Sequence, residues 1–157
     1  MQESATLKMS GLARALRAEG KNVINLSLGE PDFDTPEHIK EAAKKALDDG
    51  FTKYTPVPGL PELRKAISDK FKRDNNLAYS ADQIVVSNGA KQSLANLSLS
   101  LLNPGDEVVI LAPYWVSYYE IVKLSGAKPV IVTTDISTNF KANPEQLKAA
   151  ITDKTRF

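Results

Sequence analysis

The 157-residue sequence contains no cysteine and only one histidine. The lack of cysteine excludes a disulfide framework, a thiolate metal site and a cysteine nucleophile, and it is typical of proteins from a reducing compartment. A single histidine excludes most of the remaining metal sites. Apolar runs are short as well: none approaches the roughly 18 residues of a membrane span, and none at the start resembles a signal peptide. We therefore expect a cytoplasmic protein that binds neither a metal nor a membrane.

The sequence also lacks an excess of charge of either sign. Twenty Lys and Arg residues against nineteen Asp and Glu residues leave a formal charge of +1, which argues against nucleic acid as the main partner. Hydrophobic residues make up 42% and charged residues 25% of the chain, as in an ordinary globular domain. A domain of this length buries enough surface to form a core without disulfide or metal cross-links.

Apolar residues at helical spacing predict six helices. The first covers residues 10–19 before Gly20, and the second starts at Thr35-Pro36-Glu37, with Thr35 as its expected N-cap, and ends at Gly50. The other four are expected after the proline-rich loop of residues 52–61, over residues 90–102, after Tyr114, and after Asn143 with Gln146 as its capping-box partner.

Between these helices lie short apolar segments that predict strands, over residues 23–28, 84–86, 107–111 and 129–133. Strands that alternate with helices and are almost continuously apolar indicate a parallel sheet covered by helices on both faces. The fold class is therefore α/β, with a small and mostly parallel sheet. The chain stops at residues 154–157, where the alternation predicts another strand, so we expect it to be the leading part of a longer protein.

The turn around Gly89 is the first candidate for ligand binding, because it joins a predicted buried strand to a long predicted helix. Such a turn directs free backbone N–H groups and the positive end of the helix dipole at one point. Lys91 adds a positive charge within the first helical turn. A phosphate or carboxylate would fit there, although a glycine that only permits a tight bend would give the same pattern.

Three further residues each allow a functional and a structural interpretation. Trp115 follows the predicted strand 107–111 at the sheet edge where ligands bind, and its indole would either stack on a planar ring or pack in the core. Gly29 would let a ligand approach the backbone, or would only form a turn. The Tyr54 phenol would donate to a phosphate or would anchor its loop on the core. His38 is expected to be a surface residue.

Four segments occur together in the order and spacing of one enzyme family. They are Gly29-Glu30-Pro31-Asp32-Phe33-Asp34-Thr35-Pro36, Lys53-Tyr54-Thr55-Pro56 followed by Gly59, Gly89-Ala90-Lys91-Gln92, and Pro113-Tyr114-Trp115-Val116-Ser117-Tyr118. From about Ser4 to its end, the chain resembles the N-terminal part of class I aminotransferases of pyridoxal-phosphate fold type I, most closely the bacterial aspartate aminotransferases. The resemblance implies that residues 1–35 belong to the small domain of the family and residues 36–157 to the first part of its large cofactor-binding domain.

The resemblance also implies a site for pyridoxal 5'-phosphate. The turn of Gly89, Ala90 and Lys91 would hold the phosphate through backbone N–H groups. Trp115 would stack on the pyridine ring and border the substrate. Tyr54 would reach the phosphate in the other subunit of a homodimer.

For the substrate, the resemblance assigns the α-carboxylate to Gly29. It assigns the distal carboxylate to Lys91 together with the hydroxyls of Ser4 and Thr6, so that Lys91 has two possible roles. The implied reaction exchanges an amino group between a dicarboxylic amino acid such as aspartate and a 2-oxo acid such as 2-oxoglutarate, in amino-acid biosynthesis. Relatives with these motifs also accept prephenate, aromatic or alanine-type substrates.

The Schiff-base lysine of the family and its other catalytic side chains have no counterpart in these 157 residues. We therefore assign no catalytic residue and expect no transamination by this segment alone. Two other hypotheses remain: a truncated module that binds a phosphorylated small molecule, and a dimerisation partner of full-length subunits.

Overall fold

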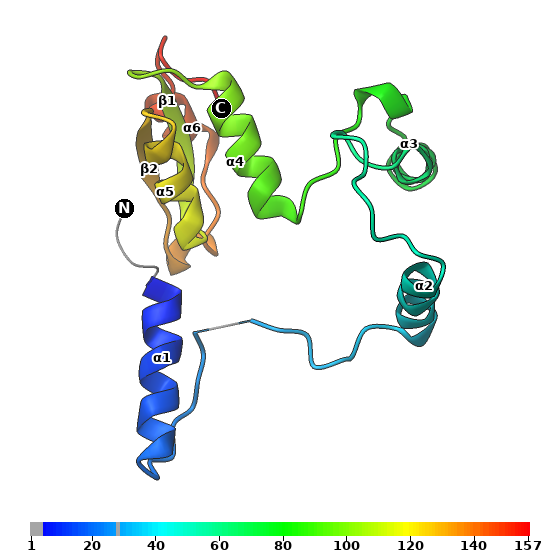
Figure 1. Cartoon of the computed structure of the whole chain (residues 1–157). Helices are drawn as coiled ribbons and strands as arrows, with labels where there is room; N and C mark the ends of the chain where they lie inside the picture. Colours follow the sequence, from blue (N-terminus) through cyan, green and yellow to red (C-terminus); the bar gives the residue numbers. More distant parts are fainter. Residues whose placement is uncertain (1–4, 28) are drawn as a thin grey trace. The chain divides into compact units, whose positions relative to one another are not determined.

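The computed structural model describes residues 5–27 and 29–157, in which the strands lie in the C-terminal half and alternate there with helices (Figure 1). These residues form two compact units. The first contains Asn88–Phe157 and the described residues before position 28, and the second contains Gly29–Ser87. No helix among the described residues is long and apolar enough to cross a bilayer.

The first unit is built on two parallel strands, β1 (Glu107–Ala112) and β2 (Lys128–Thr133), in which Val109 lies opposite Val130. The helix α5 (Val116–Leu124) connects the two strands. The remaining elements of this unit are α1 (Ala5–Ala18), α4 (Ala90–Leu101), the short 3-10 helix η2 (Ile136–Thr138) and α6 (Pro144–Ala150). The predicted capping box is present: the Gln146 N–H donates to the Asn143 side chain at 2.8 Å, and the Asn143 N–H donates to the Gln146 side chain at 3.0 Å.

The last residues of the chain extend this sheet on the free edge of β1. The Glu107 N–H donates to the Lys154 carbonyl at 2.8 Å, and the Arg156 N–H donates to the Glu107 carbonyl at 2.9 Å. The Val109 N–H then donates to the Phe157 carbonyl at 2.9 Å. The pairing of Glu107 with Thr155 is parallel, and it is an isolated bridge rather than the full strand that the alternation predicts for residues 154–157. Strand β1 consequently has partners on both edges.

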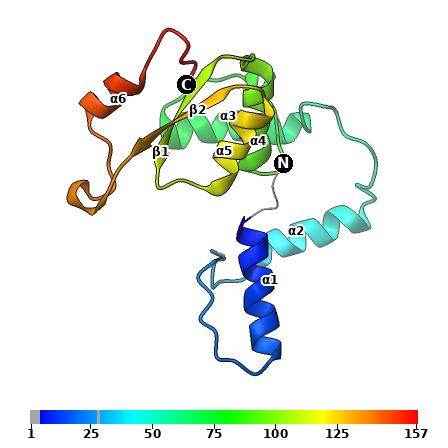
Figure 2. The same cartoon turned by 90° about the vertical axis from the view of Figure 1, so that its left-hand side faces the viewer.

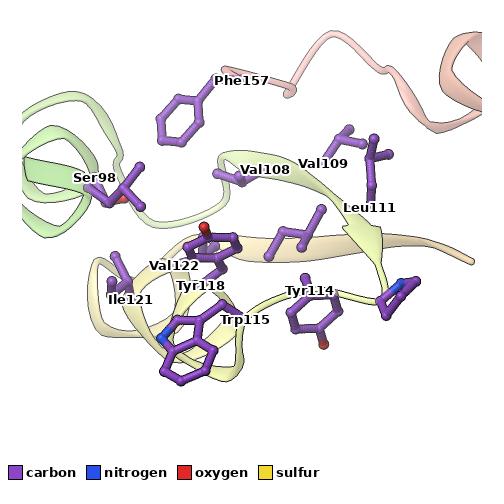
Figure 3. Close-up of a pocket in the computed structure, with 13 residues that line it drawn as sticks. Ser98, Val108, Val109, Leu111, Tyr114, Trp115, Tyr118, Ile121, Val122 and Phe157 are labelled. Carbon is purple, nitrogen blue, oxygen red and sulfur yellow. The ribbon is translucent and has the colours of Figure 1, made fainter. Parts of the chain in front are cut away.

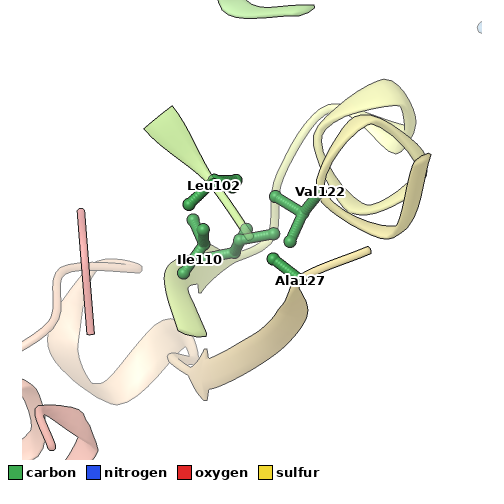
Figure 4. Close-up of a cluster of buried hydrophobic side chains, with 5 residues drawn as sticks. Leu102, Ile110, Val122 and Ala127 are labelled. Atoms are coloured by element: carbon green, nitrogen blue, oxygen red, sulfur yellow. The ribbon is translucent and has the colours of Figure 1, made fainter. Parts of the chain in front are cut away.

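Helices α5 and α6 lie on opposite sides of the two strands (Figure 2). The connection from β1 to β2 and the connection from β2 to residues 154–157 lead toward opposite edges of the sheet. Because crossovers between parallel strands are almost always right-handed, their helices are expected on opposite faces. The main hydrophobic core lies on the α5 side, between the strands, α5 and the end of α4 (Figure 4). Its members are Leu102, Val108, Ile110, Val122 and Ala127. The predicted α/β class, with a parallel sheet and helices on both faces, is confirmed.

Two buried carboxylates at the start of β1 hold the C-terminal residues against the strand. Asp106 accepts hydrogen bonds from the Asn103 N–H at 2.8 Å and from Arg156 Nε at 2.9 Å. Glu107 accepts from Thr152 Oγ1 at 2.8 Å and from Lys128 Nζ at 3.0 Å. The Asn103 N–H, together with Arg156, holds the pKa of Asp106 below its ordinary value. The Thr152 hydroxyl, with the Lys128 ammonium, does the same for the pKa of Glu107.

The second unit contains α2 (Glu37–Asp48), α3 (Pro61–Asn75) and the 3-10 helix η1 (Ala81–Gln83). Two long-range hydrogen bonds join α3 and the loop before it to the segment that follows η1. Arg64 Nε donates to the Ile84 carbonyl at 2.9 Å, and the Val86 N–H donates to the Pro58 carbonyl at 2.9 Å. These bonds order the proline-rich loop at its C-terminal end.

Two predicted strands are wrong. Residues 23–27 are extended along α1 but pair with no strand among the described residues, and residue 28 lies outside them. Their alternation is real, but Ile24 and Leu26 are the exposed positions, at 83% and 90%. Residues 84–86 are likewise not paired as a strand. A period-two pattern identifies an extended segment, but a strand also requires a neighbouring segment with free N–H and C=O groups.

Two predicted helix starts also differ from the structure. The first helix begins at Ala5 rather than Ser10, because Ser10 is buried inside the helix and its hydroxyl lies 3.2 Å from the Ser27 hydroxyl. Thr35 does not cap α2: the N-cap is Pro36, whose carbonyl accepts from the Ile39 N–H at 3.0 Å, and no side chain caps this end.

Expressed by themselves, these 157 residues should aggregate. Many large apolar side chains in both units are exposed, including Ile24 and Leu26, and no large side chain of the described residues is completely buried. The double variant Ile24→Lys/Leu26→Lys should remain in solution to a greater extent, as measured by light scattering after purification. A wild-type segment that stays monomeric and unfolds cooperatively would contradict this expectation.

The stability of the protein should decrease as the pH falls through the acidic range. A carboxylate with a lowered pKa in the folded state stabilises the fold above its unfolded-state pKa, and this stabilisation is lost as the pH falls toward the folded-state value. Urea unfolding of wild-type and Asp106→Asn protein at several pH values measures the effect, because the variant should lose part of the pH dependence. The control is Asp153→Asn at an exposed carboxylate for which no ion pair is found in the described part of the chain. An equal loss in both variants would contradict the role of Asp106.

Candidate functional site

The turn before α4 leaves several backbone donors free. Gly89 is the N-cap residue, with φ 84° and ψ 163°, and no side-chain cap satisfies this end of the helix. The N–H groups of Gln92 and Ser93 donate to the Gly89 carbonyl at 3.2 and 3.4 Å. Within residues 5–27 and 29–157, no acceptor is found for the N–H groups of Gly89, Ala90 and Lys91. Three adjacent donors therefore remain available at the positive end of a helix of twelve residues.

Gly89 leaves the approach to these donors open. Its backbone conformation belongs to a region that is essentially restricted to glycine. A Cβ atom added at this position would meet no other atom within 4 Å. The glycine is thus required by its backbone angles and not by crowding, and it forms the turn without a side chain over the free N–H groups.

The structure brings Lys91 and Trp115 together. Lys91 Nζ lies 5.7 Å from the centre of the Trp115 ring, within the range of a cation–π contact. Trp115 is the residue before α5, three positions after the end of β1, and its side chain is 44% exposed. The indole is therefore not a core residue. An aromatic face and an ammonium group lie side by side just beyond the carboxyl end of the central strand.

An open cavity of about 590 Å³ adjoins Trp115 on the core side of β1 (Figure 3). Aromatic side chains contribute much of its wall, and Tyr114 also packs against the main core. The aromatic lining residues are Tyr114, Trp115, Tyr118 and Phe157. The rest of the lining is mainly apolar and comes from β1 and the helices α4 and α5. In the segment after β1, Tyr114 therefore packs against the core, whereas Trp115 is half-exposed.

The other predicted site residues belong to other segments of the chain. Tyr54 and Gly29 belong to the second unit, and both are exposed. The Tyr54 side chain is 108% exposed, so it does not anchor its loop on a core. Thr6 lies in the first turn of α1 and is half-buried, and Ser4 lies outside the described residues. The residues that the structure brings together are therefore Gly89, Ala90, Lys91 and Trp115.

The side chain of Gln92 was not among the predicted site residues. Its Oε1 accepts a hydrogen bond from the Asn88 N–H, which precedes the three free donors. The signal for this bond was present, since a Gln at the third helical position is one half of a capping box. The other half is missing because Gly89 has no side chain.

The chain is similar to known proteins over its whole length. A family model described as aminotransferase class I and II matches residues 21–157. The aspartate/prephenate aminotransferase of Cereibacter sphaeroides is 53% identical over all 157 residues, and the aspartate aminotransferase of Rhizobium meliloti is 53% identical over 154. The chain spans 39% and 38% of the lengths of these relatives.

The chain is also similar to solved structures of aspartate aminotransferases. The crystal structure of the aspartate aminotransferase from Rhizobium meliloti matches 99% of the chain with a TM-score of 0.92 at 52% identity. The aspartate aminotransferase from Thermus thermophilus with maleate matches 99% with a TM-score of 0.94 at 47% identity. The chain covers 39% and 41% of these two structures.

Replacing Gly89 by alanine should destabilise the protein by about 1–3 kcal/mol, because an L-residue at φ 84° and ψ 163° is strained even where space is available. The matched control is Gly11→Ala in the middle of α1, where a Cβ also meets nothing within 4 Å and the change should stabilise by about 0.5–1 kcal/mol. Denaturant midpoints of the two variants measure the difference. Effects of equal sign at both positions would show that the turn does not hold Gly89 in this conformation.

Proposed function

Because the chain belongs to the class I and II aminotransferase family, we propose that the whole protein exchanges an amino group between a dicarboxylic amino acid and a 2-oxo acid. The main support is the 53% identity over the full chain with a relative called aspartate/prephenate aminotransferase. Aspartate as donor and 2-oxoglutarate as acceptor are the proposed substrates, with prephenate as a second acceptor because that name includes it. The direct test is the formation of oxaloacetate and glutamate in equal amounts from aspartate and 2-oxoglutarate.

Membership of this family implies pyridoxal 5'-phosphate as the cofactor, and the residues at the α4 turn fit that group. Three free N–H groups and the positive end of a helix favour a dianionic phosphate. A half-exposed indole beside the Lys91 ammonium offers a flat surface for an aromatic ring. When bound, pyridoxal phosphate supplies the electron sink for amino-group transfer.

In this proposal the backbone of Gly89, Ala90 and Lys91 holds the phosphate, and Trp115 orients the ring by stacking. The Lys91 side chain has a separate role from its backbone. Its ammonium lies over the Trp115 indole, where its N–H donors would bind the distal carboxylate of a substrate beside the ring. A charged partner of this kind would favour aspartate over an uncharged amino acid.

The remaining assignments follow from the family resemblance. Gly29 would bind the α-carboxylate of the substrate, and the hydroxyls of Ser4 and Thr6 would assist Lys91 at the distal carboxylate. Tyr54, whose exposed side chain is free for a contact with another subunit, would reach the phosphate in the partner's site of a homodimer. Residues 1–35 would belong to the small domain and residues 36–157 to the large one, in an enzyme of cytoplasmic amino-acid biosynthesis.

Replacing Lys91 by serine in the whole protein should reduce kcat/KM for aspartate about tenfold to a hundredfold, since a charge-assisted contact is lost. Pyridoxal-phosphate affinity should change little, because serine retains the backbone N–H. The value of kcat/KM for an uncharged amino acid of similar size should fall little or rise.

Lys123→Ser is the matched control, because Lys123 Nζ makes the same kind of contact with a different ring, that of Tyr119, at 5.4 Å. It should leave kcat/KM for both amino acids and the affinity for pyridoxal phosphate unchanged. Equal losses for the two substrates in Lys91→Ser, together with weaker cofactor binding, would assign the Lys91 side chain to the phosphate and remove the support for a dicarboxylic substrate.

A further inference from the structure

Gln92 is the third residue of α4, and its side chain reaches back over the turn to the backbone of Asn88. The Asn88 N–H donates to Gln92 Oε1. This is the only side-chain hydrogen bond found at the start of α4 among the residues that the structure describes. It occupies the Asn88 N–H and leaves the next three N–H groups of the turn unoccupied within the described residues.

The capping box of α6 shows what the same residue type does at an ordinary helix start. There the side chain of Gln146 accepts from the N–H of Asn143, which is the N-cap residue itself. At α4 the N–H group that donates to the glutamine side chain belongs to Asn88, one residue before the N-cap Gly89. The bond is shifted by one position, so that the N–H of Gly89 stays unoccupied together with those of Ala90 and Lys91.

The charge of the side chain is as important as its position. Glutamate and glutamine serve equally as the third residue of a capping box, because both present a carbonyl-type oxygen. Next to a bound phosphate, however, a carboxylate would add a negative charge to an anion site at the helix end. The amide of Gln92 provides the acceptor without that charge.

We propose that Gln92 is a positioning residue for the cofactor phosphate: its neutral amide occupies the Asn88 N–H and holds the turn so that the next three N–H groups face the anion. The proposal rests on the proposed function, because it assumes that this turn binds pyridoxal phosphate. It predicts a role in phosphate recognition that is separable from any contribution of Gln92 to folding.

The test compares pyridoxal phosphate with pyridoxal, which has no phosphate, by equilibrium titration of the apoprotein of the whole enzyme. Gln92→Glu keeps the acceptor and adds a charge, and it should weaken pyridoxal-phosphate binding about tenfold. Gln92→Met removes the acceptor without adding a charge and should weaken it about fivefold. Neither change should alter pyridoxal binding. Gln92→Glu should lose more pyridoxal-phosphate affinity than Gln92→Met. This difference should become smaller at high salt, because salt screens the added charge.

Gln146→Glu is the matched control, since it introduces the same charge at the same position of a different helix. It should bind both ligands like the wild-type protein. A Gln92→Glu variant with unchanged preference for pyridoxal phosphate would overturn the role of Gln92 while leaving the proposed function intact. Equal weakening of both ligands in the two Gln92 variants would also overturn it, because the effect would then be on folding. A wild-type protein with no preference for the phosphorylated ligand would overturn the proposed site as well.

Discussion

Strand β1 is hydrogen-bonded along both edges, and the position of the candidate site depends on this pairing. On one edge the strand is in register with β2, and on the other it bonds to residues 154–157, some fifty residues later in the chain. The buried carboxylates of Asp106 and Glu107 anchor that second edge through Arg156 and Thr152. Because a strand with two partners cannot shift its register without breaking both ladders, its carboxyl end, and with it Trp115, is held in place.

The start of α4 illustrates the opposite situation, a helix end that the chain itself does not complete. Helix α6 is capped reciprocally by Asn143 and Gln146, whereas α2, α3, α4 and α5 have no side-chain cap. The N-cap Gly89 offers no side chain and adopts a conformation that other residues avoid. Because glycine adopts this conformation without steric cost, the turn forms with an open row of backbone donors, and such donors are what an anionic group requires.

Local patterns predicted the helices well, because capping and apolar periodicity depend on neighbours within one or two turns. The capping box at Asn143 and the helix over residues 90–101 formed as expected. The strands over residues 23–28 and 84–86 were wrong because pairing depends on a partner that the local sequence does not specify. The contact of Lys91 with Trp115 could not be predicted from the local sequence either, because it joins residues 24 positions apart through the packing of α4 against α5. In that case the family resemblance, and not any spacing, placed the two residues in one site.

Under the proposed function, the same contact allows Lys91 to take both roles that the resemblance gives it, at the phosphate and at the substrate carboxylate. The two roles use different atoms: the backbone N–H lies in the row of free donors at the turn, while Nζ lies over the Trp115 ring. A long flexible side chain separates these groups by several bonds, so occupation of one by an anion does not prevent occupation of the other. Under the proposed function, Lys91 therefore connects cofactor binding to substrate recognition, and a substitution that preserves its backbone would separate the two.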